Sequence, residues 1–230
     1  MMDKLTTILF DVGWPIVDEI EVHKFWNSRI KQLVGDNTGR KVTDSKISRL
    51  EDESIVCYAP SMFSYTIWHL VKPDRELFYK IRNLFYGTSY VQHYRIQPGV
   101  RDVLQKLHGK FKLGIAANQP EEAYRFLDKE GVLQYFDSTQ VSDEIGYSKP
   151  DLRMFQKVLD NLGSRAEESL MVGDRPDNDI VPAKLLGMKT VRLMVGPHKN
   201  QQIRTPLEEP DYTIDKIIDL PNIPLISNSL

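Results

Sequence analysis

Acidic side chains end two of the strands that this sequence predicts. Asp11 closes the apolar, β-branched run TTILFD, and Asp174 closes SLMVGD, with Asp177 and Asp179 shortly after it. Carboxylates that stand so close together repel one another, and a bound hard cation relieves that repulsion. Mg²⁺ prefers one or two carboxylates, with water and a phosphate completing its shell. The alternative is a polar loop in which Asp174 only caps a helix that starts near Asp179.

A lysine in the segment GYSKPD could balance these acids. Lys149 precedes Pro150, and a residue before proline is kept out of the helical region of the backbone. A helix is expected to start directly after it, so the lysine side chain could reach the acids at the strand ends. On its own, a lysine before proline is more often a solvated surface residue.

The elements that must position these side chains alternate in the C-terminal part of the chain. Strands are expected at 111–118, 136–142, 169–174 and 189–196, each followed by a helical pattern. This alternation predicts an α/β fold, with a parallel sheet covered on both faces by helices. In such sheets ligands bind at the carboxyl ends of the strands. The strand ends of interest are therefore Asp11, Asn118, Ser142 and Asp174.

The segment 20–92 has a different character. Apolar residues recur at helical spacing in EVHKFWNSRIKQL and in three later stretches, and Thr43 or Asp44 is expected to cap the second helix. The block is therefore expected to be helical. Its aromatic residues are more often core than ligand contacts.

Composition restricts the partners and the compartment. The net charge of −2, from 30 basic and 32 acidic residues, gives no reason to expect binding to nucleic acid or to an anionic membrane. The apolar runs are far shorter than the roughly 20 residues of a membrane span. Cys57 is the only cysteine, so no internal disulfide can form and a cytoplasmic location is expected. We expect Cys57 to be a packed thiol and GPHKN, with His198, to be a surface turn.

Four segments resemble the motifs of the haloacid dehalogenase-like hydrolase superfamily. The first motif, a hydrophobic strand followed by Asp-x-Asp-Gly-Thr-Leu-x-Asp, is matched by ILFDVGWPIVD. The approach to the second is matched by QPGVRDVLQKLHGKFKLGIAAN, and the third by FDSTQVSDEIGYSKPDLRMFQKVLDNLG. The fourth, a strand followed by Gly-Asp-x4-Asp, a helix and Gly-Met, is matched by SLMVGDRPDNDIVPAKLLGMKTV. The last two are long, specific matches at the proper separation.

The resemblance implies a fold and an activity. The fold is a Rossmann-like parallel sheet in a three-layer α/β/α core, formed by 1–17 and 93–230, with an inserted α-helical cap at 18–92. The activity is that of a Mg²⁺-dependent phosphatase, which acts on a small phosphorylated metabolite, a phosphomonoester, through an aspartyl-phosphate intermediate. Such an enzyme is expected to be a monomer or a homodimer.

The same resemblance implies roles for five residues. Asp11 is the nucleophile that takes the phosphoryl group. Mg²⁺ is held by Asp11, by the backbone carbonyl of Gly13 and by Asp174, with Asp179 as the outer-shell partner. Lys149 keeps Asp11 and the phosphate in register. The residue types suit this chemistry, because the cation and the lysine neutralise charge on the transferring oxygens.

The first and second motifs also depart from the family's pattern. Gly13 replaces the second Asp, which normally protonates the leaving group and activates water, and this help is worth roughly 10²–10⁴-fold in rate. Pro15 stands where Thr is usual, and Ala117 where Ser or Thr bonds the phosphate. Asn118 beside it is expected to bind phosphate through its backbone N–H. Trp14, in the loop after the nucleophile, is expected to lie over the crevice and contact the substrate.

Two alternatives remain open. The departures favour a catalytically weak or non-catalytic protein that keeps the fold for binding or regulation. A 2-haloacid dehalogenase is a further possibility, since that branch also carries a residue other than Asp at the place of Gly13. Asp174 favours a phosphate-handling protein over a dehalogenase, because the dehalogenases lack the metal aspartate.

Overall fold

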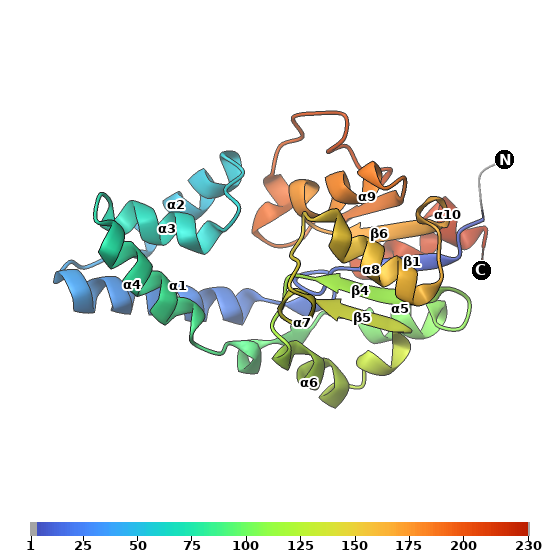
Figure 1. Cartoon of the computed structure of the whole chain (residues 1–230), viewed down its shortest axis with the longest axis horizontal. Coiled ribbons are helices and arrows are strands. Elements are labelled where there is room, and N and C mark those ends of the chain that lie inside the picture. Colours follow the sequence, from blue (N-terminus) through green and yellow to red (C-terminus); the bar gives the residue numbers. More distant parts are fainter. Residues whose placement is uncertain (1–3, 230) are drawn as a thin grey trace. The chain divides into compact units, whose positions relative to one another are not determined.

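The computed structural model describes residues 4–229 of the chain. The chain divides into two units (Figure 1). One comprises the segment up to Asp18 together with the segment from Arg95 onward, and the other spans Glu19–Tyr94. The first unit contains the predicted sheet, and the second is helical.

The sheet has six parallel strands in the order β5-β4-β1-β6-β7-β8. The strand β1 is central, and its last residue, Phe10, pairs with Ile115 of β4 and Val172 of β6. The predicted parallel α/β sheet is thereby confirmed. The strands are β1 (Thr7–Phe10), β4 (Lys112–Ala117), β5 (Ser138–Val141), β6 (Ser169–Gly173), β7 (Lys189–Leu193) and β8 (Tyr212–Ile214).

Helices surround this sheet (Figure 1). The helices α8 and α9 pack on one face, where Phe155 and Ala183 join a buried cluster with Leu9 and Met171. A Cβ on Gly114 would lie 2.7 Å from side-chain atoms of Leu9 and Val158, so glycine lets α8 approach the sheet closely. The helices of this unit are α5 (Val100–Leu107), α6 (Glu122–Lys129), α7 (Ser142–Ile145), α8 (Leu152–Leu162), α9 (Val181–Leu185) and α10 (Pro224–Ser227).

A short antiparallel ribbon joins the two places where the chain leaves and re-enters the sheet unit. The strands β2 (Val17–Asp18) and β3 (Arg95–Ile96) pair with Asp18 opposite Arg95. Our sequence prediction contains neither strand, because two residues are too few for an alternating pattern to emerge.

The second unit contains four helices in its described sequence. They are α1 (Ile20–Thr38), α2 (Asp44–Val56), α3 (Met62–Val71) and α4 (Arg75–Tyr86). The Thr43 hydroxyl accepts the backbone N–H of Lys46, which confirms Thr43 as the N-cap of α2.

Aromatic rings form the core of the helical unit. Trp26 of α1 is 3% exposed, with its ring centroid 3.8 Å from that of Phe85 and 6.1 Å from that of Phe63. One expectation for this unit was wrong, since Cys57 is exposed rather than packed. Cys57 follows Val56, the last residue of α2, and its side chain is not packed in the core of the helical unit.

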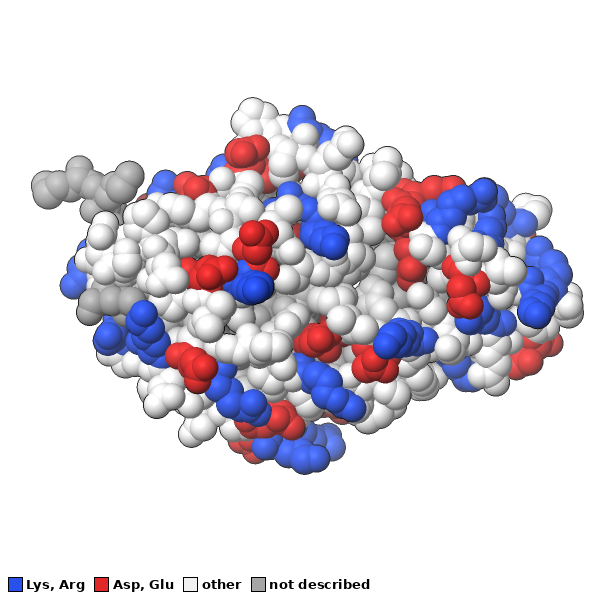
Figure 2. Space-filling model, turned by 180° about the vertical axis from the view of Figure 1, so that it is seen from behind, with Lys and Arg blue, Asp and Glu red and all other residues white. Residues whose placement is uncertain are grey.

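The surface of the molecule is mixed in charge. On the face shown in Figure 2, acidic and basic side chains are interspersed over both units. In the described part of the chain, α-helices are too short or too polar to cross a lipid bilayer.

Candidate active site

Asp11 directly follows the central strand β1 and so lies at the carboxyl edge of the sheet. Its backbone N–H donates to the carbonyl of Val172 in the neighbouring strand β6, at 2.9 Å. Its carboxylate oxygen Oδ1 accepts the N–H of Val12 at 2.7 Å. The side chain is 14% exposed, so a carboxylate stands at the surface of an otherwise buried edge.

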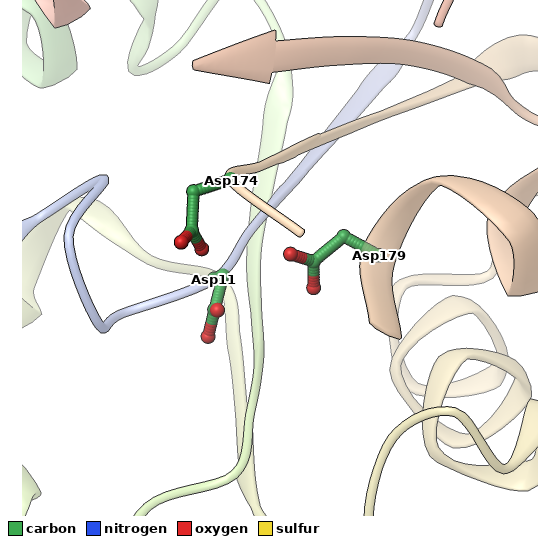
Figure 3. A group of neighbouring side chains, drawn as sticks. All are labelled: Asp11, Asp174 and Asp179. Atoms are coloured by element: carbon green, nitrogen blue, oxygen red, sulfur yellow. The ribbon is translucent and has the colours of Figure 1, made fainter. Parts of the chain in front are cut away.

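Asp174 follows the last residue of β6, beside Asp11 (Figure 3). Carboxylate oxygens of Asp11, Asp174 and Asp179 lie within 4.8 Å of one another. Asp174 is 2% exposed, and its Oδ2 is buried without a hydrogen-bond partner. The side chain therefore does not act as the helix cap that we considered as the alternative.

Asp179 completes the cluster from the wide helical turn η4 (Pro176–Ile180), which has π geometry. Its Oδ2 accepts the backbone N–H of Arg175 at 3.0 Å, and the residue is fully buried. A Cβ on Gly173 would lie 2.3 to 2.5 Å from atoms of the Asp179 side chain. Glycine in this position is therefore needed for Asp179 to reach the end of β6.

Lys149 lies among these carboxylates with a side chain that is 1% exposed. Its Nζ is 2.9 Å from Oδ1 of Asp11 and 2.6 Å from Oδ1 of Asp179. The structure thus brings the lysine to the acids, rather than to the solvated surface that we considered as the alternative.

Asn118 holds the backbone of Lys149. Its Nδ2 donates to the Lys149 carbonyl at 3.0 Å, and the Lys149 N–H donates to its Oδ1 at 2.7 Å. The amide side chain is thereby committed to the backbone of Lys149. Ser142 begins α7, and its hydroxyl donates to the carbonyl of Gln119 instead of joining the acids.

Trp14 adopts a left-handed backbone conformation, with φ at 69°, which bulky residues rarely occupy. Its N–H donates to the carbonyl of Val17 at 2.8 Å and closes a tight turn in which Gly13 is buried. A Cβ on Gly196 would lie 2.5 to 2.8 Å from ring atoms of Trp14, so the indole packs directly on that glycine. Because Gly196 follows β7, this contact links the turn after β1 with the segment after β7.

The acidic run after β6 divides into two parts. Asp177 lies outside the cluster and pairs with Arg175 through two contacts, at 2.6 and 3.2 Å. Our sequence analysis did not identify this pair, although the spacing of two residues in a loop is compatible with it. The turn η5 (Pro197–Asn200) is present with Lys199 and Asn200 exposed, but His198 is buried and contacts Gln201 at 3.1 Å, so only its expected place on the surface was wrong.

The electrostatics of the cluster follow from its burial. Burial raises the pKa of Asp11 to about 6, against the lowering effect of Lys149. Burial and the neighbouring Asp179 and Asp11 raise the pKa of Asp174 well above its ordinary value. Burial alone would lower the pKa of Lys149, but Asp11 and Asp179 outweigh it and the pKa lies above the ordinary value. Three carboxyl groups therefore share one lysine, and burial and mutual repulsion oppose their ionisation.

The donor set fits Mg²⁺. Three acidic groups present hard oxygen ligands at one point, and the buried Oδ2 of Asp174 lacks any other partner. An unpartnered buried carboxylate oxygen is costly, and coordination to a divalent cation removes that cost. Asp11 and Asp174 would hold the cation, together with the carbonyl of Gly13, and Asp179 would support them.

Comparison with known proteins gives one family. A family model described as haloacid dehalogenase-like hydrolase matches residues 8–193. The chain is 40% identical over 110 residues to a glyceraldehyde 3-phosphate phosphatase of Methanocaldococcus jannaschii, covering 48% of this chain and 45% of that protein. It is 29% identical over 228 residues to Pyrophosphatase PpaX of Halalkalibacterium halodurans, covering 96% and 97%. The chain spans about half the length of the glyceraldehyde 3-phosphate phosphatases that it matches.

The fold has solved counterparts as well. A crystal structure of a HAD phosphatase from Thermococcus onnurineus superposes with a TM-score of 0.68 at 23% sequence identity, covering 95% of this chain and 97% of that one. At this level of identity the likeness supports the fold alone.

Proposed function

This chain belongs to the haloacid dehalogenase-like hydrolase family, and on that premise we propose that it is a Mg²⁺-dependent phosphatase of small phosphorylated metabolites. Its reaction passes through a phosphoryl group carried on Asp11. The observation that carries the proposal is the contact of Lys149 with both Asp11 and Asp179, beside the partnerless oxygen of Asp174. A structural ion pair alone gives no reason for a third buried carboxylate at the same point.

The chemistry follows from the positions of the chain's own residues. An Asp11 oxygen attacks phosphorus, the bond from phosphorus to the leaving oxygen breaks, and the electron pair departs with the leaving group. Lys149 keeps Asp11 oriented and offsets negative charge on the phosphoryl oxygens. Water then attacks the phosphoryl group, and Asp11 is released as a carboxylate. When bound, Mg²⁺ supplies Lewis-acid neutralisation of the phosphate oxygens.

We assign the helical unit the role of a cap that selects the substrate. Its position in the chain supports this role, since the insert begins at Glu19, eight residues after the nucleophile. The relatives' names support a small phosphorylated substrate. With a single cysteine in the sequence, we place the enzyme in the cytoplasm, as a monomer or a homodimer.

A second candidate function is that of a binding or regulatory protein without turnover. The observation in its favour is the absence of an acidic side chain at Gly13 and of a hydroxyl at Ala117. The dehalogenase alternative is weaker, because an acidic cluster with a partnerless carboxylate oxygen would repel a carboxylate substrate.

The proposal is tested with 4-nitrophenyl phosphate and Mg²⁺. We expect hydrolysis by the wild type, and loss of at least about 10³-fold in rate for Asp11→Asn and on chelation, because both remove the attacking group or the charge it depends on. Asp128→Asn, the same substitution on the exposed surface of α6, is the matched control and should match the wild type. Unchanged activity in Asp11→Asn would show that the nucleophile is elsewhere. Mg²⁺ binding without turnover would favour the regulatory protein.

A further inference from the structure

Within the described residues of the sheet unit, the side chains around Asp11 offer no proton donor to a leaving group. In the described part of the sheet unit, the charged groups that act on Asp11 are Lys149, Asp174 and Asp179. The two aspartates are the groups that would hold or support the cation, a role that occupies their oxygens. The residues that follow Asp11 directly are Val12 and Gly13, and neither has a side chain that can donate a proton.

Lys149 is committed to two carboxylates. Its Nζ lies 2.6 Å from an oxygen of Asp179 and 2.9 Å from an oxygen of Asp11. A proton given to a leaving group would leave a neutral amine between two buried carboxylates, which is electrostatically unfavourable. Lys149 therefore serves as a fixed positive charge rather than as an acid.

Three further titratable side chains in the described part of the sheet unit bond to partners in other segments. The ring of His198 contacts Gln201 in the segment after β7, and β6 separates that strand from β1. The hydroxyl of Tyr124 donates to Glu144 and accepts the N–H of Val141 at the end of β5, two strands from β1. His108 contacts the carbonyl of Tyr135 and precedes β4, at the opposite end of the parallel sheet.

We propose that this site favours substrates whose leaving group departs without a proton: acyl phosphates and phosphoanhydrides rather than phosphate esters of simple alcohols. This inference rests on the proposed phosphatase function and specifies its substrate class. An unprotonated carboxylate leaving group has a conjugate acid of pKa about 4, whereas an alkoxide resembles hydroxide, whose conjugate acid water has a pKa of about 15.7. The difference in leaving ability is largest where no acid assists.

The bonds and protons of the proposed steps balance without a proton donor from the protein. An Asp11 oxygen forms a bond to phosphorus, the bond to the acyl or phosphate oxygen breaks, and the leaving group takes the electron pair as an anion. Water next attacks the phosphorus on Asp11, and the bond to Asp11 breaks. Both water protons remain on the product, which leaves as H₂PO₄⁻ and equilibrates with solvent.

One relative supports the direction of this inference. Pyrophosphatase PpaX, which this chain matches over 96% of its length, is named for a phosphoanhydride substrate. The leaving group of such a substrate is itself a phosphate, so it leaves as a stable anion.

The test compares acetyl phosphate with phenyl phosphate in the full-length protein with Mg²⁺. The conjugate acids of the two leaving groups have pKa values of about 4 and about 10. The ratio kcat/KM covers substrate binding and phosphoryl transfer to Asp11, and it excludes the later hydrolysis step that both substrates share. We expect the wild-type ratio of kcat/KM, acetyl over phenyl, to be at least about 10³. Gly13→Asp places a carboxylic acid two residues after the nucleophile and should reduce this ratio by about 10²-fold or more. Gly13→Asn has the same size, cannot donate an acidic proton, and should leave the ratio near that of the wild type.

Several outcomes would overturn the inference. A wild-type ratio within about 10-fold of unity would reveal a proton donor elsewhere in the chain, for example in the helical unit. Equal reductions in Gly13→Asp and Gly13→Asn would show a steric effect instead of acid catalysis. If both variants fail to fold, a series of aryl phosphates of graded leaving-group pKa decides with the wild type alone, since a flat dependence contradicts the inference and a steep one supports it. Absence of hydrolysis of every substrate would instead refute the phosphatase function on which the inference depends.

Discussion

At the scale of single residues, the most informative contact is the pair of hydrogen bonds from Asn118 to the backbone of Lys149. The two residues are 31 positions apart in the sequence, and the amide donates at 3.0 Å and accepts at 2.7 Å. The backbone of Lys149 is thereby fixed to the end of β4, while its side chain extends to Asp11 at the end of β1. Asn118 therefore acts as a positioning residue for the lysine.

We expect Asn118→Ala to lower both stability and turnover. Loss of the amide leaves a backbone N–H and carbonyl of Lys149 unpaired, which costs about 1–3 kcal/mol in the free energy of unfolding. A displaced lysine should lower kcat by about 10-fold to 10²-fold. Urea denaturation and steady-state kinetics measure the two effects.

Gln134→Ala is the matched control for Asn118→Ala. Its amide donates to the carbonyl of Gly131, and the residue precedes β5 at the other end of the sheet, so activity should be retained. Full kcat in Asn118→Ala would contradict the positioning role.

At the scale of elements, the contact of α1 with α3 contains a partly buried histidine. His23 lies one turn before Trp26 on α1, and its ring centroid is 5.4 Å from that of Phe63 on α3. Burial lowers the pKa of His23 to about 4. The neutral ring is thus part of the packing of the helical unit, and charging it opposes folding.

This burial predicts a loss of stability in acid. The unfolded chain takes up a proton on His23 near its ordinary pKa of about 6.5, whereas the folded chain does so only near pH 4. Between these values the unfolded state binds more protons, so stability falls as the pH falls. The contribution of His23 should decrease by about 2 kcal/mol between pH 7.5 and pH 5.

Urea denaturation of the wild type and of His23→Phe at the two pH values measures this contribution. His23→Phe should lack that part of the acid-induced loss, while His108→Gln, a change at an exposed histidine, should retain it. The same acid-induced loss in His23→Phe as in the wild type would contradict the assignment.

At the scale of the whole molecule, the site is assembled from segments that are distant in sequence. Asp11, Lys149 and Asp174 come from three separate connections, which the strand order β4-β1-β6 brings to one edge. The acidic groups of this cluster share one lysine, so in the absence of a further cation repulsion between them opposes their ionisation. Binding of a divalent cation should therefore stabilise the whole sheet unit against unfolding, and its effect should not be confined to one loop.

We expect Mg²⁺ to raise the melting temperature of the protein. At a free concentration of about 100 times its Kd, a ligand that binds only the folded state adds about 2.7 kcal/mol to the free energy of unfolding. For a chain of this size the shift is about 5–10 °C. Differential scanning calorimetry with Mg²⁺ and with EDTA measures it without any substrate.

Two variants of the same loop make this measurement specific. Asp174→Asn should abolish the Mg²⁺-dependent shift, because Asp174 contributes the partnerless oxygen. Asp177→Asn should retain the shift, because Asp177 pairs with Arg175 outside the cluster. Equal shifts in both variants would contradict the proposed metal ligands.

The sequence by itself determined the alternating strands and helices, because periodicity of apolar residues and capping residues are local signals. Strands ending at Asp11 and Asp174 were expected from such signals, and the structure ends them one residue earlier, at Phe10 and Gly173. A cap at Thr43 or Asp44 was expected as well, and Thr43 provides it. The parallel sheet follows from the alternation, and the strand-end rule directed attention to Asp11 and Asp174.

Only the tertiary structure decided how the acids divide and what holds the lysine. Asp177 and Asp179 are equally acidic in the sequence, yet one pairs with Arg175 and the other approaches Gly173. The two-residue ribbon β2–β3 and the buried His198 also depend on contacts with distant segments. The physical reason is common to these cases: a side chain's partner is set by through-space distance and burial, and neither quantity is a property of the local sequence.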